Sequence, residues 1–153
     1  MYSVKVNNEE ETLIVAYHLG KKLFPGCLIT LDGDLGAGKT TFTKGIAKGL
    51  EIKQIVNSPT FTIIKEYEGK LPLYHMDVYR INDDEDLGFD EYFYGNGVTV
   101  IEWANNIRSL LPHERLSLNI VILSDNARHL KFTPFGKKYG QICEDLKHEK
   151  IID

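Results

Sequence analysis

The sequence predicts an α/β fold, a three-layer sandwich built around a mixed β-sheet. Near the N-terminus strands and helices alternate, beginning with a strand at Tyr2–Val6 and a helix from Asn8 to Leu23. Toward the C-terminus the strands Leu116–Leu123 and Arg128–Thr133 follow each other across a turn. Alternation favours parallel strands with crossover helices, whereas local pairing favours antiparallel strands. The sheet is therefore expected to contain both, and residues 1–153 are expected to form a single domain.

Capping residues and apolar spacing predict the first helix. Asn8 is a typical N-cap residue, and Glu11 three residues later completes a capping box. Ala16 and Gly20 then fall along one stripe of the helix surface. A turn and a buried strand follow over Phe24–Leu31.

The rest of the chain contains apolar runs bounded by turn and capping residues. Asn82 is a candidate N-cap with Glu85 at the third position, and the acidic residues after Asn82 suit a first helical turn. The further elements expected are a helix at Thr40–Leu50, strands at Phe61–Tyr67, Leu71–Asp77 and Val98–Glu102, a short helix at Asn105–Leu111 and a terminal helix at Gly136–Ile151.

A glycine-rich run separates the strand at Phe24–Leu31 from the helix at Thr40–Leu50. It fits the phosphate-binding pattern G-x-x-x-x-G-K-[ST], in the strand–loop–helix context that the pattern requires. Backbone N–H groups of such a loop form a nest for phosphate oxygens, and the following helix adds its positive end. Lys39 would reach the terminal phosphates, and the Thr40 hydroxyl is a candidate Mg²⁺ ligand. The motif predicts a nucleoside triphosphate site that includes Gly33, Asp34, Leu35, Gly36, Ala37, Gly38, Lys39, Thr40 and Thr41.

Composition and charge set bounds on partners and location. The net charge of −4 gives no support for direct nucleic-acid binding. No apolar stretch approaches the length of a membrane span, and Met1–Lys5 lacks a signal-peptide pattern. Cys27 and Cys143 lack metal-site spacing and are too few for a disulfide framework. These features favour a cytoplasmic protein that does not contact a membrane.

Two carboxylates end apolar strands, where a phosphate-binding loop needs a partner for Mg²⁺ or for its waters. They are Asp77 and Glu102. Either one fits the role of metal partner, and the other would then orient water. Trp103 follows Glu102 directly and is either a core residue or a contact at the mouth of the site. His75 and His113 show no paired metal spacing and are interpreted as structural residues.

The segment Ser58-Pro59-Thr60 lies between the loop's helix and the next predicted strand. Nucleotide-sensing switch loops occupy this place, where a hydroxyl can respond to the γ-phosphate and Mg²⁺. An ordinary Ser/Pro turn explains the same residues equally well. Arg80 follows the Asp77 strand and either reaches phosphate or pairs with the acidic run nearby.

Missing motifs narrow the class of nucleotide-binding protein. Neither Asn-Lys-x-Asp nor Thr-Lys-x-Asp occurs, and no Asp-x-x-Gly follows the strand that ends at Asp77, which argues against a GTPase and favours ATP. The absence of Leu-Ser-Gly-Gly-Gln argues against a transporter-type ATPase. Small-molecule kinases carry an arginine-rich lid, whereas the arginines here are scattered. The missing lid disfavours a small-molecule kinase of the P-loop class, which is kept as the alternative.

Four motifs occur in an order and at a spacing that resemble the TsaE (YjeE) family over nearly the whole chain. They are the loop Gly33–Thr41, Ser58-Pro59-Thr60-Phe61-Thr62, Tyr74-His75-Met76-Asp77-Val78-Tyr79-Arg80 and Ile101-Glu102-Trp103. Members of this family are small bacterial ATPases needed to form N6-threonylcarbamoyladenosine at position 37 of tRNAs that read ANN codons.

The resemblance implies a P-loop α/β domain with ATP as its nucleotide and Mg²⁺ as its metal. Lys39, Asp77 and Glu102 would be the catalytic residues. Thr40 and Glu102 would be the metal ligands, and Asp77 would act near the γ-phosphate.

The resemblance also implies further contacts and partners. Ser58 and Thr60 would belong to a switch loop, and by position Asn8 and Arg128 would approach the nucleotide. The protein partners would be TsaD, which transfers the threonylcarbamoyl group, and TsaB, which pairs with TsaD. The chain would be a slow ATP hydrolase that assists this pair, and it would meet tRNA only through the complex.

Overall fold

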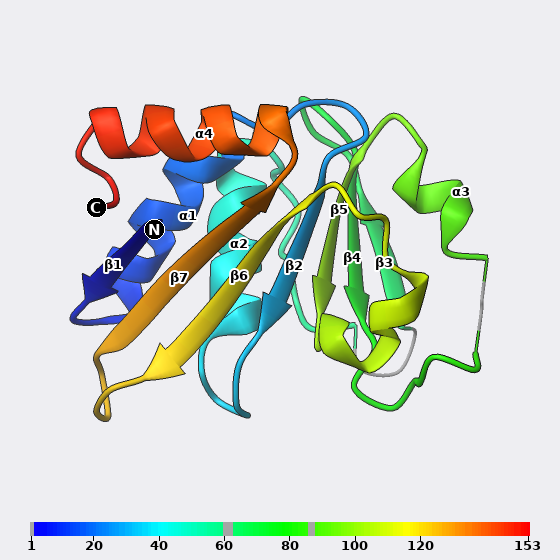
Figure 1. The fold of residues 1–153 in the computed structure, drawn as a ribbon, viewed down its shortest axis with the longest axis horizontal. Coiled ribbons are helices and arrows are strands. Elements are labelled where there is room, and N and C mark those ends of the chain that lie inside the picture. Colours follow the sequence, from blue (N-terminus) through cyan, green and yellow to red (C-terminus); the bar gives the residue numbers. More distant parts are fainter. Residues whose placement is uncertain (1, 60–62, 86–87) are drawn as a thin grey trace.

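The structure is a computed structural model that describes residues 2–59, 63–85 and 88–153. Its strands are β1 (Tyr2–Val6), β2 (Leu28–Asp32), β3 (Ile64–Tyr67), β4 (Leu73–Asp77), β5 (Val98–Glu102), β6 (Arg115–Ile122) and β7 (Arg128–Phe135). Within the described ranges these strands form one seven-stranded sheet in the order β1-β7-β6-β2-β5-β4-β3 (Figure 1). The strands β6, β2, β5 and β4 pair in parallel, and β1, β7 and β3 pair antiparallel. The predicted mixed sheet is confirmed.

Helices cover the two faces of this sheet. They are α1 (Glu9–Gly20), α2 (Lys39–Gly49), α3 (Asp90–Phe93), the 3₁₀ segment η1 (Ala104–Leu110) and α4 (Lys137–His148). One apolar core joins α1, α2 and α4 to the sheet, and α1 and α2 lie behind the sheet in Figure 1. A second, smaller core joins α3 and η1 to the opposite face through Met76 and Ile101. The three-layer α/β sandwich is therefore confirmed, with shorter helices in its second helical layer.

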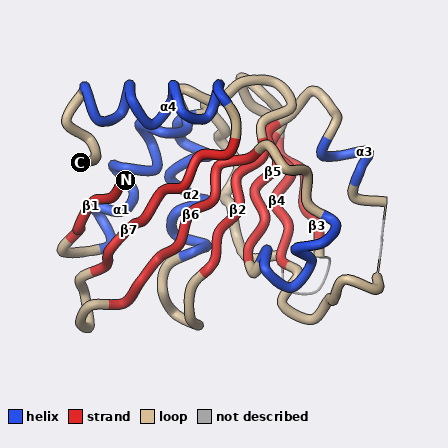
Figure 2. The backbone as a smooth tube through the Cα atoms, viewed as in Figure 1, coloured by secondary structure: helices blue, strands red, loops and turns tan. Residues whose placement is uncertain are grey.

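The parallel pairing brings several strand ends to one edge of the sheet. The strands β2, β5 and β4 all run toward the lower edge in Figure 1, and the loops that follow them are clustered there in Figure 2. In open α/β sheets ligands bind outside the carboxyl ends of the strands. The fold therefore places the glycine-rich loop, Asp77 and Glu102 on the same side of the molecule.

Helices α1 and α2 approach each other so closely that their backbones touch. A β-carbon added to Gly20 would lie 2.5 Å from the carbonyl oxygen of Ile46. A β-carbon added to Gly49 would lie 2.5 Å from the carbonyl oxygen of Tyr17. This contact fixes the position of α2 on the sheet, and the first turn of α2 follows directly from the glycine-rich loop.

The prediction of a helix that begins after Asn82 is wrong. The side-chain oxygen of Asn82 accepts a hydrogen bond from the backbone N–H of Asp84 at 2.9 Å, and the Glu85 N–H donates to the Asn82 carbonyl at 3.1 Å. Asparagine can satisfy the backbone two residues on in this way, and the resulting turn competes with a helix start. The short helix α3 begins instead at Asp90.

Several element ends differ from the predicted ones by a few residues. The terminal helix α4 ends at His148 rather than Ile151, and Lys150 has a positive φ of 64°. The strand predicted at Phe61–Tyr67 is described from Ile64, because Ile63 has a φ of 65° and residues 60–62 lie outside the described ranges. A positive φ is incompatible with both helix and strand geometry, so it ends the element.

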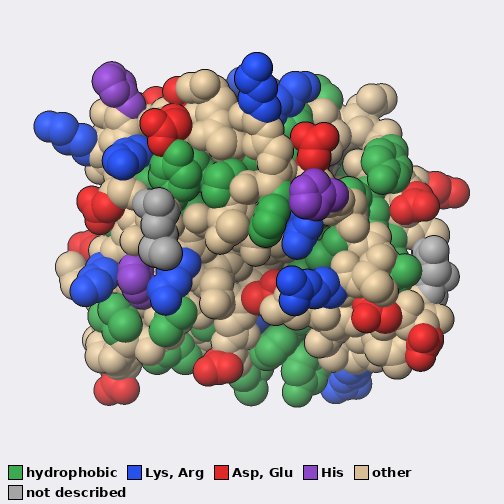
Figure 3. All heavy atoms as spheres, viewed as in Figure 1, with side chains coloured by type: hydrophobic (Ala, Val, Ile, Leu, Met, Phe, Trp, Pro, Cys, Tyr) green, Lys and Arg blue, Asp and Glu red, His purple; other side chains and the backbone are tan. Residues whose placement is uncertain are grey.

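Charges on the face seen in Figure 3 are scattered. Acidic and basic side chains both occur over β6 and β7 and around them, without gathering into one large basic patch on this face. Among the described helices, none is long and apolar enough to cross a bilayer.

The contact between α1 and α2 predicts that Gly49→Ala destabilises the protein by about 1–3 kcal/mol, the usual cost of overpacking. Gly140→Ala in α4 is the matched control, because its β-carbon would meet no atom within 4 Å. Removing a helical glycine without a clash stabilises by about 0.5–1 kcal/mol. Urea unfolding of both variants checks this prediction, and a Gly49→Ala variant as stable as the wild type would contradict it.

Candidate active site

The loop between β2 and α2 has two glycines whose backbone borders open space. Gly36 and Gly38 have φ angles of 81° and 109°, in the region that favours glycine. A β-carbon on Gly36 would meet no atom within 4 Å, and one on Gly38 would meet only the Thr41 Cβ at 4.0 Å. Gly33 is needed for close packing, because a β-carbon added to it would lie 2.5 Å from the carbonyl oxygen of Ile120. Gly33 therefore lies against β6, whereas Gly36 and Gly38 line the cavity beside the loop.

The Lys39 side chain is buried at the start of α2. Its Nζ donates hydrogen bonds to the carbonyls of Gly33 at 2.7 Å and Asp34 at 3.0 Å, and it lies 3.8 Å from the centre of the Trp103 ring. Burial lowers the pKa of the Lys39 ammonium, while nearby carboxylates, Glu102 first among them, act in the opposite direction. Lys39 is thus a cation held inside the glycine-rich loop.

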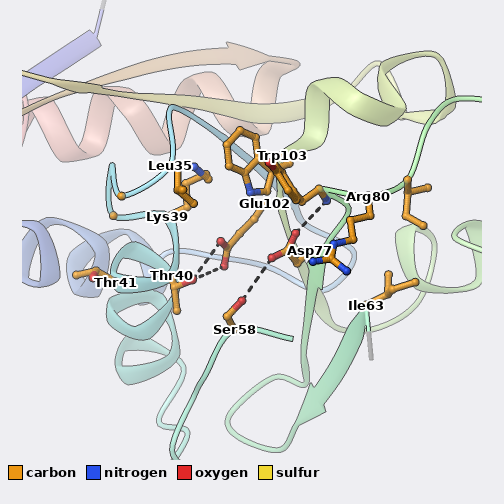
Figure 4. A pocket seen from close by; sticks show the side chains of 14 residues that line it. Leu35, Lys39, Thr40, Thr41, Ser58, Ile63, Asp77, Arg80, Glu102 and Trp103 are labelled. Atoms are coloured by element: carbon orange, nitrogen blue, oxygen red, sulfur yellow. Dashed lines mark hydrogen bonds between the residues drawn. The ribbon is translucent and has the colours of Figure 1, made fainter. Parts of the chain in front are cut away.

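Thr40 and Glu102 meet across the space between α2 and β5. The Thr40 hydroxyl oxygen lies 3.0 and 3.1 Å from the two carboxylate oxygens of Glu102, to which it donates (Figure 4). Glu102 is buried. The pair supplies one hydroxyl and one carboxylate as oxygen donors, and the described residues contain no cluster of three His, Cys, Asp or Glu side chains that could hold a metal ion. Magnesium commonly binds through one or two protein ligands together with substrate phosphates and water, which this pair fits.

Asp77 stands beside Glu102 because the two residues are register partners of β4 and β5. One Asp77 oxygen accepts a hydrogen bond from the Tyr79 N–H at 3.0 Å. The other accepts one from the Ser58 hydroxyl at 3.4 Å, so the structure joins the predicted loop residue to the predicted carboxylate (Figure 4). Thr60, the other hydroxyl of that loop, lies outside the described residues.

A cavity of about 670 Å³ brings these residues together. Its polar lining includes Lys39, Thr40, Ser58, Asp77, Arg80 and Glu102, and its apolar lining includes Leu35, Ile63, Ile81 and Trp103. Of the two places proposed for Trp103, the structure supports the mouth of the site. Arg80 also lines the cavity, on the side opposite the glycine-rich loop in Figure 4, and a contact of Arg80 with phosphate stays a prediction.

The sequence interpretation missed His75. Its ring is fully buried, and Nε2 lies 2.5 Å from Oε2 of Glu102. His75 and Asp77 are two residues apart on β4, so their side chains share one face of the sheet. The parallel pairing of β4 with β5 then places Glu102 on the same face. Strand periodicity was the signal available in the sequence, but it becomes informative only once β5 is known to be the neighbour of β4.

Arg128 contacts the glycine-rich loop, whereas the hydrogen bonds of Asn8 lie at the start of α1. Asn8 forms the predicted capping box, because its side chain accepts from the Glu11 N–H at 2.8 Å and Glu11 accepts from the Asn7 N–H at 2.9 Å. Arg128 donates from Nε to the Ala37 carbonyl at 3.0 Å, which braces the loop from β7. A small cavity of about 160 Å³ is lined by Arg128 and by neighbours of Asn8, but not by Asn8 itself. A nucleotide contact by either residue stays a prediction.

A buried strand, a glycine loop, a lysine at the first helical position and a carboxylate at the end of a neighbouring strand together define a P-loop α/β domain. Comparison with known proteins gives the family. The model of the family "Threonylcarbamoyl adenosine biosynthesis protein TsaE" matches residues 6–130. The chain belongs to the TsaE family.

Individual relatives agree with this assignment. The chain is 56% identical over 147 residues to the tRNA threonylcarbamoyladenosine biosynthesis protein TsaE of Bacillus subtilis, covering 94% of this chain and 93% of that protein. The protein of the same name from Treponema pallidum is 44% identical, with 73% of this chain and 85% of that protein covered. The crystal structure of Bacillus subtilis YdiB superposes with a TM-score of 0.88 at 48% identity, covering 98% of this chain and 97% of that one.

Proposed function

We propose that this chain is a cytoplasmic, Mg²⁺-dependent ATPase of low intrinsic activity. It would assist a TsaB–TsaD pair in forming N6-threonylcarbamoyladenosine at position 37 of tRNAs that read ANN codons. Membership of the TsaE family supports the pathway. The observation that carries the nucleotide chemistry is the contact of Thr40 with Glu102 beside the loop that holds Lys39. The absent guanine-reading motifs favour ATP over GTP.

The residues of the cavity suggest how ATP would be held. The loop N–H groups would bind phosphate oxygens, and Lys39 would exchange its carbonyl partners for the terminal phosphates. Thr40 and Glu102 would hold Mg²⁺, which when bound would neutralise charge on the phosphate oxygens. Asp77 lies beside Glu102 in the register and would orient the attacking water.

The same cavity suggests why a partner would be needed. Fast hydrolysis requires a positive group on the charge that develops at the γ-phosphate. Arg80 lines the cavity but is exposed at its edge, and an exposed arginine side chain keeps most of its rotamer freedom. A partner would order Arg80 and the Ser58 loop, or supply a cation of its own.

Lys39→Ala is expected to weaken ATP binding at least tenfold, because each charge-assisted hydrogen bond to phosphate contributes about 1.5–3 kcal/mol. Calorimetric titration with Mg²⁺ and ATP measures the affinity. Lys44→Ala is the matched control, since Lys44 lies on the same helix and is exposed. Wild-type affinity in a folded Lys39→Ala variant would overturn the site.

Glu102→Gln is expected to impair the hydrolysis that Mg²⁺ supports, while nucleotide binding without the metal persists. A neutral amide is a poorer ligand for a hard cation than a carboxylate, whereas the glycine loop and Lys39 are unchanged. Asp77→Asn is expected to slow hydrolysis and to keep the metal dependence. Phosphate release measured across a Mg²⁺ series distinguishes the two variants, and the opposite pattern would exchange the roles of the two carboxylates.

A TsaB–TsaD pair is expected to raise the rate of ATP hydrolysis above that of the isolated chain. Steady-state phosphate release is measured with and without the pair, and complex formation is confirmed by gel filtration. Equal rates in the two samples would contradict the assisting role. Transfer of labelled phosphate from ATP to a small acceptor, without any partner, would favour a small-molecule kinase instead.

A further inference from the structure

His75 touches the site without lining its cavity. The ring is fully buried in β4, and Nε2 lies 2.5 Å from Oε2 of Glu102. We propose that His75 is a positioning residue that holds the Glu102 carboxylate toward Thr40 and thereby sets the affinity of the site for Mg²⁺. This inference rests on the proposed function, in which Glu102 is a metal ligand.

The chemistry of the two groups defines the direction of the contact. An ionised carboxylate only accepts hydrogen bonds, so Nε2 of His75 carries the proton and donates it. Nδ1 of His75 is buried and has no hydrogen-bond partner among the residues that the structure describes. A neutral imidazole ring has one N–H and one bare nitrogen, and a carboxylate offers no proton to a bare nitrogen, so Nδ1 is the bare atom. The arrangement therefore directs the ring's single donor to Glu102.

The contact has a geometric consequence for Glu102. A glutamate side chain has several rotatable bonds, and a buried carboxylate with one partner could turn about them. His75 approaches Oε2 from β4, and Thr40 approaches the same carboxylate from α2. Two donors on different elements fix both the position and the rotation of the carboxylate group. Hydrogen-bond partners of metal ligands orient those ligands in this way.

The His75 hydrogen bond also keeps Glu102 from pairing with Lys39. The ammonium of Lys39 attracts Glu102 electrostatically, since this carboxylate is the strongest of the charges that favour the protonated lysine. A carboxylate that turned to pair with Lys39 would remove both the metal ligand and the phosphate-binding cation. The His75 hydrogen bond opposes that rotation, and Lys39 is left on the carbonyls of its own loop.

A purely structural role explains the observations less well. The core on this side of β4 is apolar and includes Leu73 and Val100. An apolar side chain would fill such a place without leaving a ring nitrogen unpaired, which costs about 1–3 kcal/mol in a buried position. The contact with Glu102 is what the histidine provides and an apolar residue would not.

The test compares two substitutions that differ by one methylene group. His75→Gln places an amide N–H near the position of Nε2, whereas the shorter side chain of His75→Asn places it near Nδ1, out of reach of Glu102. Thr99→Val is the control, because Thr99 is fully buried on the neighbouring strand and bonds to the Tyr92 carbonyl instead of Glu102. ATP affinity is measured by calorimetry in chelator and over a Mg²⁺ series, and thermal unfolding confirms that each variant is folded.

The expected result is a shift in metal dependence alone. His75→Asn should raise the Mg²⁺ concentration for half-maximal ATP affinity about 10–100-fold, the usual effect of removing a partner of a metal ligand. Its ATP affinity in chelator should stay within about twofold of wild type, since the phosphate contacts are unchanged. His75→Gln should restore most of the metal dependence, and Thr99→Val should keep all of it even where its unfolding temperature falls.

Three outcomes would overturn the proposal. They are an unchanged Mg²⁺ dependence in His75→Asn, an equal shift in Thr99→Val, and a folded His75→Gln that behaves as His75→Asn does. If His75→Asn does not fold, His75→Gln decides alone. A normal Mg²⁺ dependence in His75→Gln would support the proposal, and a shifted one would overturn it. If the ATP affinity of the wild-type chain does not change with Mg²⁺ concentration, the proposed function on which this inference rests is itself contradicted.

Discussion

The parallel pairing of β2, β5 and β4 is the constraint on which the rest of the site depends. Leu31 of β2 pairs with Glu102 of β5, and Glu102 pairs in turn with Asp77 of β4. These pairings bring three loops to one edge of the sheet, although their residues are far apart in sequence. A shift of one residue in either pairing would turn a carboxylate to the opposite face, because side chains alternate along a strand.

The site is a network of buried polar groups, and each group depends on its neighbours. Lys39 and Glu102 are both removed from water, and an isolated buried charge is costly. Thr40 and His75 donate to Glu102, and backbone carbonyls accept from Lys39, so the charges have partners without forming a closed ion pair. Such an arrangement keeps both charges available for a ligand.

Rigid packing surrounds this network. The glycine contact between α1 and α2 fixes α2 on the sheet, and Arg128 braces the loop from β7. Trp103 has a φ of 63° and donates its N–H to the Leu31 carbonyl, which places its ring over Lys39 at the mouth of the cavity. The hydroxyl of Ser58 donates to Asp77 at 3.4 Å, which connects the loop that contains Ser58 to this network.

The sequence by itself determined the elements whose signals are local. The glycine loop, the Asn8 capping box and the strand ends at Asp77 and Glu102 follow from residue type and short-range spacing, and the structure has each of them where the sequence predicts it. The prediction of a helix after Asn82 failed because the Asn82 side chain can accept a backbone hydrogen bond in a turn as well as at a helix N-terminus. The residue pattern left open which carboxylate meets Thr40 and where Trp103 lies, and it did not place His75 in the site; the tertiary structure decided all three. Those facts depend on which strands become neighbours, and strand order is set by packing over the whole sheet rather than by any short stretch of sequence.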